Sequence, residues 1–199
     1  MMSKTHLSIG MATALALCPI TGLNSCLLAL AGGALGGVIP DVDILDNDYK
    51  NDALNGELAA FGTLAFAVVV NFLTGGNIIS TVLAYKWSAI VGAVAFIILW
   101  IKGYHCPHRG FTHSLLSMVL FTISIGLIYS PISIPFLFGY FSHLMLDILN
   151  KKKIRLLFPF KGGVCLNLCY ANKKANTVFM VGGFVATAIL LAFHLIRRY

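Results

Sequence analysis

Charged side chains are scarce in this sequence of 199 residues. They make up 11% of it, whereas hydrophobic residues make up 58%, and the mean hydropathy is +0.87. Charged residues account for about 25% of an ordinary soluble domain, so the composition excludes a secreted enzyme, a transcription factor and a disordered tail. The composition predicts an integral membrane protein. Because apolar segments leave no length for a separate soluble domain, we expect one membrane domain over residues 1–199.

Acidic residues and cysteine pairs are also rare. Seven Asp and Glu residues stand against fourteen Lys and Arg residues, which gives a net charge of +7. Most of the basic residues lie in short stretches beside apolar segments, where lipid head groups and membrane topology account for them. We therefore expect no nucleic-acid partner. The five cysteines form no pair of CxxC motifs, which argues against a disulfide framework and a structural cysteine–zinc site.

Long apolar runs dominate what is present. Each is expected to be a helix, because hydrocarbon offers no partner to an unpaired backbone group. The first two are shorter than the roughly 20 residues of a full span, so they either cross tilted or distorted, or form a re-entrant pair. The glycine-rich stretch at 32–37 predicts a close-packing surface. The fold class is therefore an all-α, polytopic transmembrane bundle of about seven apolar segments: 7–20, 25–39, 58–73, 82–101, 115–129, 132–149 and 177–196.

The polar residues gather on one predicted side of the membrane. Alternating segments place residues 1–6, 40–57, 102–114 and 150–176 on the side of the amino terminus, with eleven of the fourteen Lys and Arg residues. The positive-inside rule makes this side cytoplasmic. All seven acids and five of the six histidines lie there too. Ionisable groups at a membrane are costly unless they are paired, hydrated or bound to metal, so each is a functional candidate.

His143 and Asp147 give the sharpest local pattern. Their i,i+4 spacing places an imidazole and a carboxylate on one face of an apolar helix. The pair either supplies two ligands to one cation or forms a hydrogen bond that satisfies both groups inside the bundle. His6, at the start of the first segment, is a further candidate, although a lone interfacial histidine is more often structural.

Asp41 and Asp43 directly follow the second apolar segment and Pro40. Proline blocks the regular helical hydrogen bond, so we expect an extended turn that aims both carboxylates the same way. The alternative is a solvated acidic loop.

The run from His108 to Ser114 is a polar cluster at the entry to the fifth segment. His108 and His113 would point about 140° apart on a regular helix, so their convergence requires the loop and Gly110 to bend. Thr112 is a candidate helix cap, and the five donors of Arg109 suit a phosphate or carboxylate group. The alternative is a membrane-surface loop with a snorkelling arginine.

These candidates together offer nitrogen and oxygen ligands and no thiolate, which suits Zn²⁺, Mn²⁺ or Fe²⁺. Seven of them exceed the three protein ligands usual for one catalytic zinc ion, so a two-metal centre follows if most converge. Such a centre activates water and stabilises charge on a phosphoryl or acyl oxygen, which makes hydrolysis the natural reaction class. The seven are His6, Asp41, Asp43, His108, His113, His143 and Asp147.

Four blocks in this order resemble the YdjM-like family of bacterial inner-membrane proteins, which are described as metal-dependent hydrolases. They are Thr5-His6, the IPDVD of residues 39–43, the HRGFTHSLL of 108–116 and the GYFSHLMLD of 139–147. The resemblance runs from about residue 5 to residue 160 and is expected to fade in 161–199, a loop and last helix. It implies a location in the bacterial inner membrane.

A more distant similarity, carried by the HxxxD pair, is to zinc-dependent phospholipase C and P1-type nucleases. It implies phosphoester hydrolysis, and a membrane location then implies a lipid or lipid-linked substrate. In this interpretation Asp43 and His108 are further ligands or acid/base groups, and Arg109 holds the substrate's anionic group. The metal ligands are His6, Asp41, His113, His143 and Asp147.

Three other functions fit the same residues. A transporter of divalent cations or protons would need polar residues that continue toward the far side of the membrane. A haem protein with two axial histidines would leave the carboxylates without a role. A membrane protein that binds metal without catalysis fits as well. The sequence indicates no oligomeric state.

Overall fold

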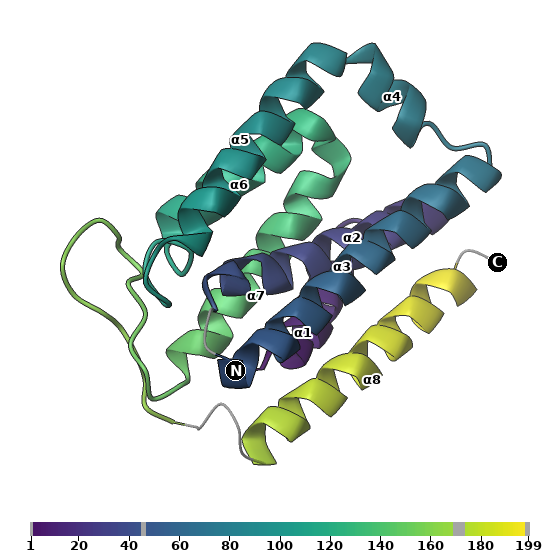
Figure 1. The fold of residues 1–199 in the computed structure, drawn as a ribbon. Helices are drawn as coiled ribbons and strands as arrows, with labels where there is room; N and C mark the ends of the chain where they lie inside the picture. The colour runs from purple at the N-terminus through teal and green to yellow at the C-terminus, as the bar shows by residue number, and fades with distance from the viewer. Residues whose placement is uncertain (1, 45–46, 169–173, 198–199) are drawn as a thin grey trace.

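The computed structural model describes residues 2–44, 47–168 and 174–197, and these form an all-helical bundle (Figure 1). An isolated antiparallel bridge joins Ile154 and Val164 in the loop after the seventh helix. The α-helices are α1 (Ser3–Leu17), α2 (Leu23–Val38), α3 (Asn47–Leu73), α4 (Ile78–Ala84), α5 (Lys86–Tyr104), α6 (Leu115–Ile128), α7 (Ser133–Ile148) and α8 (Lys174–Ile196), with 3-10 helices η1 (Ile39–Asp43) and η2 (Ser130–Ile132).

The all-α prediction is confirmed, but five helical segments rather than seven have the length and composition of a membrane span. Among the described residues, α6 is a shorter apolar helix, and α1 also falls short of spanning length. The second segment was expected to be too short for a full span, but it reaches spanning length because η1 continues α2. The five are Leu23–Asp43, Tyr49–Leu73, Lys86–Tyr104, Ser130–Ile148 and Lys174–Ile196.

Two helices have different limits from those expected. The predicted segment 82–101 is divided, because α4 ends at Ala84 and α5 begins at Lys86, with Tyr85 between them in a non-helical conformation. The predicted segment 58–73 is the second half of α3, which already begins at Asn47. The polar stretch before residue 58 therefore continues the apolar helix instead of forming a loop.

Helices α1, α2 and α7 form the centre of the bundle. In the spanning window of α2, 89% of residues are buried, against 22% for α3, 17% for α5 and 11% for α8. The glycines of α2 explain this close packing: a Cβ atom on Gly37 would meet the backbone carbonyl of His6, and one on Gly36 would meet the backbone of Phe136. The predicted close-packing surface is confirmed. It brings the beginning of α1 and the middle of α7 against the end of α2.

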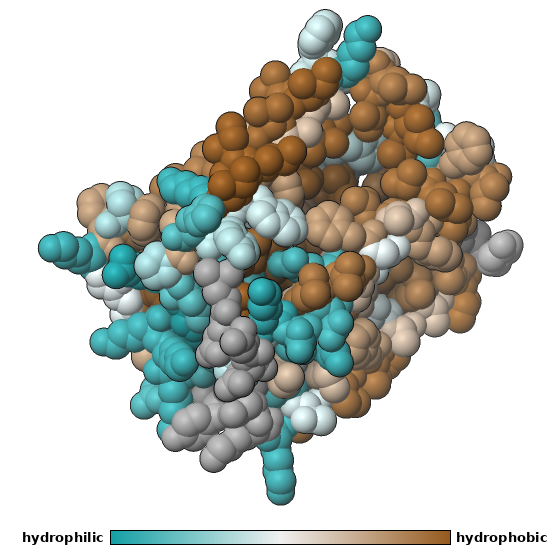
Figure 2. All heavy atoms as spheres, viewed as in Figure 1, coloured by the Kyte–Doolittle hydropathy of each residue, from teal (hydrophilic) through white to brown (hydrophobic). Residues whose placement is uncertain are grey.

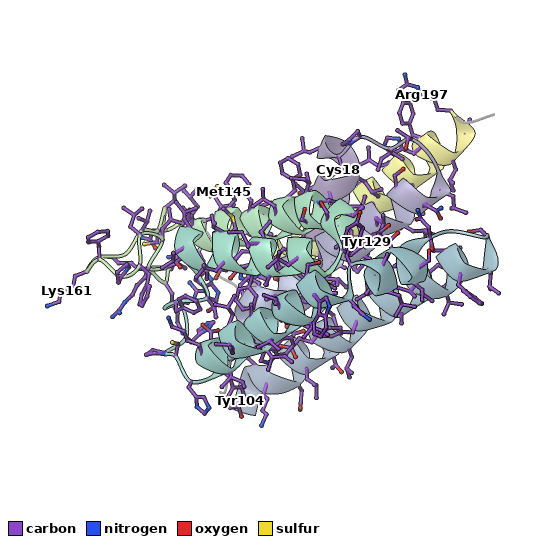
Figure 3. All side chains as sticks on the ribbon, turned by 90° about the horizontal axis from the view of Figure 1, so that it is seen from above. Cys18, Tyr104, Tyr129, Met145, Lys161 and Arg197 are labelled. Atoms are coloured by element: carbon purple, nitrogen blue, oxygen red, sulfur yellow. The ribbon has the colours of Figure 1, made fainter. Side chains whose placement is uncertain are left out.

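The bundle has a polar end and an apolar body. Hydrophilic side chains gather over the amino terminus and the loop after α7, whereas hydrophobic ones cover the outer helices (Figure 2). Tyr104 and Lys161 lie toward the polar end, and Cys18 and Arg197 lie toward the other (Figure 3). Exposed apolar side chains on α3, α5 and α8, such as Phe72, Ile98 and Ile189, indicate a surface made for lipid.

Candidate metal centre

Four separate elements bring the predicted residues together at the polar end of the bundle. Helix α1 supplies one histidine, η1 two aspartates, the loop 105–114 two histidines and an arginine, and α7 a histidine and an aspartate. The side chain of His108 is 38% exposed, and the other residues are buried: His6, Asp41, Asp43, Arg109, His113, His143 and Asp147.

The ligand atoms fall into three overlapping sets. Within each set, one nitrogen or oxygen atom of every residue lies within 4.8 Å of the others. His143 belongs to two sets and His113 to two, so the sets join into one continuous cluster. They are His6–His143–Asp147, Asp41–His113–His143 and Asp43–His108–His113.

The middle of the cluster has dimensions that fit a zinc-sized ion. Nε2 of His113 lies 3.2 Å from Nε2 of His143 and 3.3 Å from Oδ2 of Asp147. Oδ1 of Asp41 lies 3.7 Å from the first of these nitrogens and 3.6 Å from the second. Two ligand atoms on one tetrahedral zinc ion are about 3.3 Å apart. The buried His and Asp side chains can therefore hold a metal ion.

The environment of His6 also indicates that the cluster can hold a metal ion. Its ring stacks on that of His143 with centroids 3.7 Å apart. Its Nε2 lies 3.5 Å from Oδ1 of Asp147, and neither of its ring nitrogens has a hydrogen-bond partner in the described part of the chain. A fully buried imidazole without hydrogen-bond partners is costly, and a metal ion would remove that cost.

The sequence analysis predicted that Asp41 and Asp43 aim the same way, and this prediction is wrong. Residues 39–43 form a 3-10 helix instead of an extended turn, so side chains two positions apart diverge by about 120°. Asp41 faces Nε2 of His113, and Oδ2 of Asp43 lies 3.4 Å from Nδ1 of the same ring. The two carboxylates flank one imidazole.

Both oxygens of Asp43 accept hydrogen bonds from the protein. Oδ1 lies 2.7 Å from Nδ1 of His108, while Oδ2 accepts from the Arg109 backbone N–H and from the Thr112 hydroxyl, at 3.0 and 2.6 Å. Asp43 therefore orients the loop and its histidines. This arrangement is typical of a carboxylate that supports a metal-binding histidine.

The loop 105–114 bends as predicted but caps the following helix with a different residue. The loop bends at Gly110 as predicted, in a turn closed by a hydrogen bond from the Gly110 backbone N–H to the Pro107 carbonyl at 3.0 Å. Arg109 within this turn has a φ of 67°, in the left-handed region, which the sequence analysis did not predict. Ser114, and not Thr112, is the N-cap of α6, and its side chain accepts a hydrogen bond from the Ser117 backbone N–H. Thr112 is directed at Asp43 instead.

Two backbone carbonyls fix the orientation of the centre. Nδ1 of His143 lies 2.7 Å from the Gly37 carbonyl oxygen, so an Nδ1–H donated there leaves Nε2 free to bind a metal ion. The Tyr140 hydroxyl donates to the Thr112 carbonyl at 2.5 Å, which ties the loop to α7.

Arg109 connects the cluster to the surface loop that follows α7. One terminal nitrogen donates to the Lys152 carbonyl at 2.6 Å, and the other lies 3.4 Å from Oδ2 of Asp147. Its Nε is buried without a hydrogen-bond partner. The guanidinium thus keeps donor capacity beside the cluster.

His113, in the loop outside the spanning helices, has a strongly shifted pKa. Burial by itself lowers the pKa, but Asp43, Asp147 and Asp41 outweigh it and raise the pKa well above its ordinary value. In the metal-free protein the three carboxylates therefore favour the charged form of this histidine.

Asn176 on α8 is a supporting residue that the sequence analysis missed. Its side-chain oxygen accepts from the Met2 backbone N–H and the Thr5 hydroxyl, at 3.0 and 2.8 Å. In the same turn, the Ser3 hydroxyl donates to Asp41 at 3.1 Å. Small polar residues at the start of α1 were the available signal, but nothing local in the sequence connects them to residue 176.

A helical bundle with apolar outer faces and a buried His and Asp cluster that can bind metal defines a class of integral membrane protein. The chain belongs to the YdjM inner membrane protein family, with a match that covers residues 1–198. The expectation that the resemblance fades after residue 160 is therefore wrong. No curated protein and no solved structure matches the chain. The similarity to zinc-dependent phospholipase C and nucleases stays a prediction.

Proposed function

We propose that this protein is a metal-dependent hydrolase embedded in the bacterial inner membrane, which cleaves a phosphoester bond in a lipid or lipid-linked substrate. The observation that carries the proposal is that two ligand sets, His6–His143–Asp147 and Asp41–His113–His143, share His143 and so form one continuous centre. One structural ion needs no more than one such set, whereas hydrolytic centres commonly hold two ions about 3.5–4 Å apart.

The ligands in this proposal are His6, Asp41, His113, His143 and Asp147. An all-nitrogen and oxygen set favours zinc, with manganese and iron as the other candidates. When bound, such an ion supplies Lewis-acid stabilisation of charge on a phosphoryl oxygen.

The chain's own residues supply positioning and proton transfer. Asp43 accepts Nδ1–H of His108, which leaves Nε2 of this half-exposed ring free to take or give a proton at the solvent side of the cluster. Arg109 holds an anionic oxygen next to Asp147. Since Asp43 accepts hydrogen bonds from His108, the Arg109 backbone N–H and Thr112, we assign it the role of orienting His108 and His113.

The polar end is assigned to the cytoplasm, and the chain to a multi-pass topology. Lysines such as Lys4, Lys50 and Lys102 lie at this end, whereas Lys86 and Arg197 lie at the other. This asymmetry follows the positive-inside rule. Asp46, Lys173 and Arg198, which also entered the sequence-based counts, lie outside the described residues.

Hydrolysis is preferred to transport because of the surroundings of the cluster. A cavity of about 310 Å³ toward the opposite end is lined by apolar side chains, among them Leu28, Ile78, Ile128 and Phe136. A translocated cation would find no ligands there. The exposed ring of His108 opens the cluster to the polar end instead.

Elemental analysis of the detergent-purified protein, followed by phosphoester assays, tests the proposal. Wild type should carry at least one transition-metal ion per chain, and His143→Ala and Asp41→Ala, which act from different elements, should both lose it. His105→Ala is the matched control, because that exposed histidine at the same end belongs to none of the ligand sets. All variants are first shown to be folded by thermal unfolding.

Two results would overturn the proposal. One is a wild-type protein that stays metal-free after reconstitution with Zn²⁺ and Mn²⁺. The other is a fully loaded protein that cleaves neither phospholipids nor model phosphomonoesters and phosphodiesters. The first removes the metal centre, and the second leaves a metal-binding membrane protein without this activity.

A further inference from the structure

The loop after α7 builds a basic pocket beside the cluster. The pocket has a volume of about 520 Å³ and is lined by His108, Arg109, Lys152, Lys153, Arg155, Gly162 and Gly163. No carboxylate is among the described lining residues, and within the described part of the chain Lys152, Lys153 and Arg155 form no ion pair. The pocket thus gathers the positive charges of Lys152, Lys153 and Arg155, which no carboxylate in the described part of the chain pairs with.

The pocket is held in place by backbone hydrogen bonds. The Arg155 backbone N–H donates to the Arg109 carbonyl at 3.1 Å, and the Arg109 guanidinium donates to the Lys152 carbonyl. Ile154 and Val164 exchange two backbone hydrogen bonds, of 3.0 and 2.9 Å. Gly163 lies so close to Lys153 that a Cβ atom would come within 2.9 Å of the lysine Cβ. The basic side chains therefore project from a fixed frame.

Arg109 forms the boundary between the pocket and the cluster. Arg109 lines the pocket and is only 9% exposed. Its guanidinium lies 3.4 Å from Asp147, and its Nε has no hydrogen-bond partner in the described part of the chain. An anion in the pocket would therefore sit next to the metal centre.

The same loop carries exposed apolar side chains. Leu157 is 63% exposed, Phe160 75% and Leu168 70%. Basic residues interleaved with exposed apolar ones are typical of segments that lie at the level of lipid head groups. Phosphate is the anion that occurs at that level.

We propose that this pocket, with Arg109, Lys152, Lys153 and Arg155, binds the phosphate group of the substrate and places it beside the His and Asp cluster. That the bound phosphate belongs to a substrate rests on the proposed function. Guanidinium groups pair with two phosphate oxygens at once, and lysines add point charges. The phosphate belongs either to a lipid or to a soluble phosphate ester.

Calorimetric titration tests the pocket without turnover. The protein, in maltoside micelles with EDTA, is titrated with glycerol 3-phosphate, with dihexanoyl phosphatidate, and with dihexanoyl glycerol as the lipid that lacks phosphate. The pocket variant Lys153→Gln/Arg155→Gln is compared with Lys50→Gln/Lys174→Gln, which removes the same charge from exposed positions outside the pocket. Thermal unfolding and metal content verify that both variants fold.

We expect the pocket variant to bind the phosphate ligands at least about tenfold more weakly, because two charge-assisted contacts are lost, and the control variant to stay within about twofold of wild type. Binding of both phosphate ligands assigns recognition to the head group, and binding of phosphatidate alone assigns it to a lipid.

Three outcomes would overturn the inference. They are an equal loss of binding in both variants, no difference in binding between wild type and the pocket variant, and binding of dihexanoyl glycerol as tight as that of the phosphate ligands. Since the chelator removes metal, failure here is separate from failure of hydrolysis.

Discussion

Nε2 of His113 lies 3.2 Å from Nε2 of His143, although thirty positions separate the two residues. Two imidazole nitrogens this close must share either a proton or a cation, since two lone pairs would repel each other. With Asp41 and Asp147 within 4 Å of both nitrogens, the contact becomes the centre of a charged, buried cluster.

Asp43→Asn should weaken metal binding without removing a ligand. The amide would point a donor at the Thr112 hydroxyl or the Arg109 backbone N–H, both of which now donate to the carboxylate. Loss of such a supporting group typically lowers metal affinity by about 10–100-fold. Competition with a chromogenic zinc chelator measures the change. An affinity equal to that of wild type would show that Asp43 does not position His113.

Gly37→Ala should destabilise the protein and disturb the centre. A Cβ atom there would overlap the His6 carbonyl at 2.5 Å, and the Gly37 carbonyl is the partner of His143. Overpacking of this kind costs about 1–3 kcal/mol, measured as a lower free energy of unfolding in detergent. Gly62→Ala is the control, because a Cβ atom on Gly62 meets nothing within 4 Å, and it should be neutral or slightly stabilising. Equal effects of the two substitutions would contradict the packing argument.

Asn176→Leu should lower both stability and metal affinity. It removes the acceptor of the Met2 N–H and the Thr5 hydroxyl, which costs about 1–3 kcal/mol if these groups stay buried, and it loosens the turn that carries His6. Thr187→Val is the comparison, since Thr187 contacts α1 at Ser8, farther along the helix. It should lower the unfolding temperature and leave metal affinity unchanged. The same loss of metal in both variants would refute a specific role for Asn176.

Metal affinity should rise with pH up to the raised pKa of His113. The carboxylates around this ring keep it protonated in the metal-free protein, and a metal ion must displace that proton to reach Nε2. Binding therefore releases a proton at neutral pH and weakens as the pH falls. Calorimetry in buffers of different ionisation enthalpy counts the released protons. A proton count of zero at pH 7 would show that His113 is not a ligand.

The sequence alone indicated the composition of the candidate site. Each residue of the cluster stands out because a polar or ionisable side chain in or beside an apolar helix is costly, so His143 and Asp147 were recognisable from spacing alone. The glycines at 32–37 likewise predicted close packing, because little else permits backbones to touch. Helix limits were less accurate where polar residues continue a helix, as before residue 58 in α3.

The geometry of the site depended on contacts between distant segments. The sequence could not show that η1 turns as a 3-10 helix, so that Asp41 and Asp43 flank His113, because its local pattern permits an extended turn equally well. It could not show that Thr112 bonds Asp43 instead of capping α6. Both outcomes follow from the packing of η1 against the loop 105–114.

What the sequence determined by itself is the lipid-facing helical character of the protein and the kind of atoms in its centre, since hydropathy and side-chain chemistry are properties of single residues. What only the tertiary structure decided is which of those atoms meet. Asn176 lies 171 positions from Thr5 and the basic loop lies 43 positions from Arg109, and such distances are closed by the packing of whole helices, which no local pattern records.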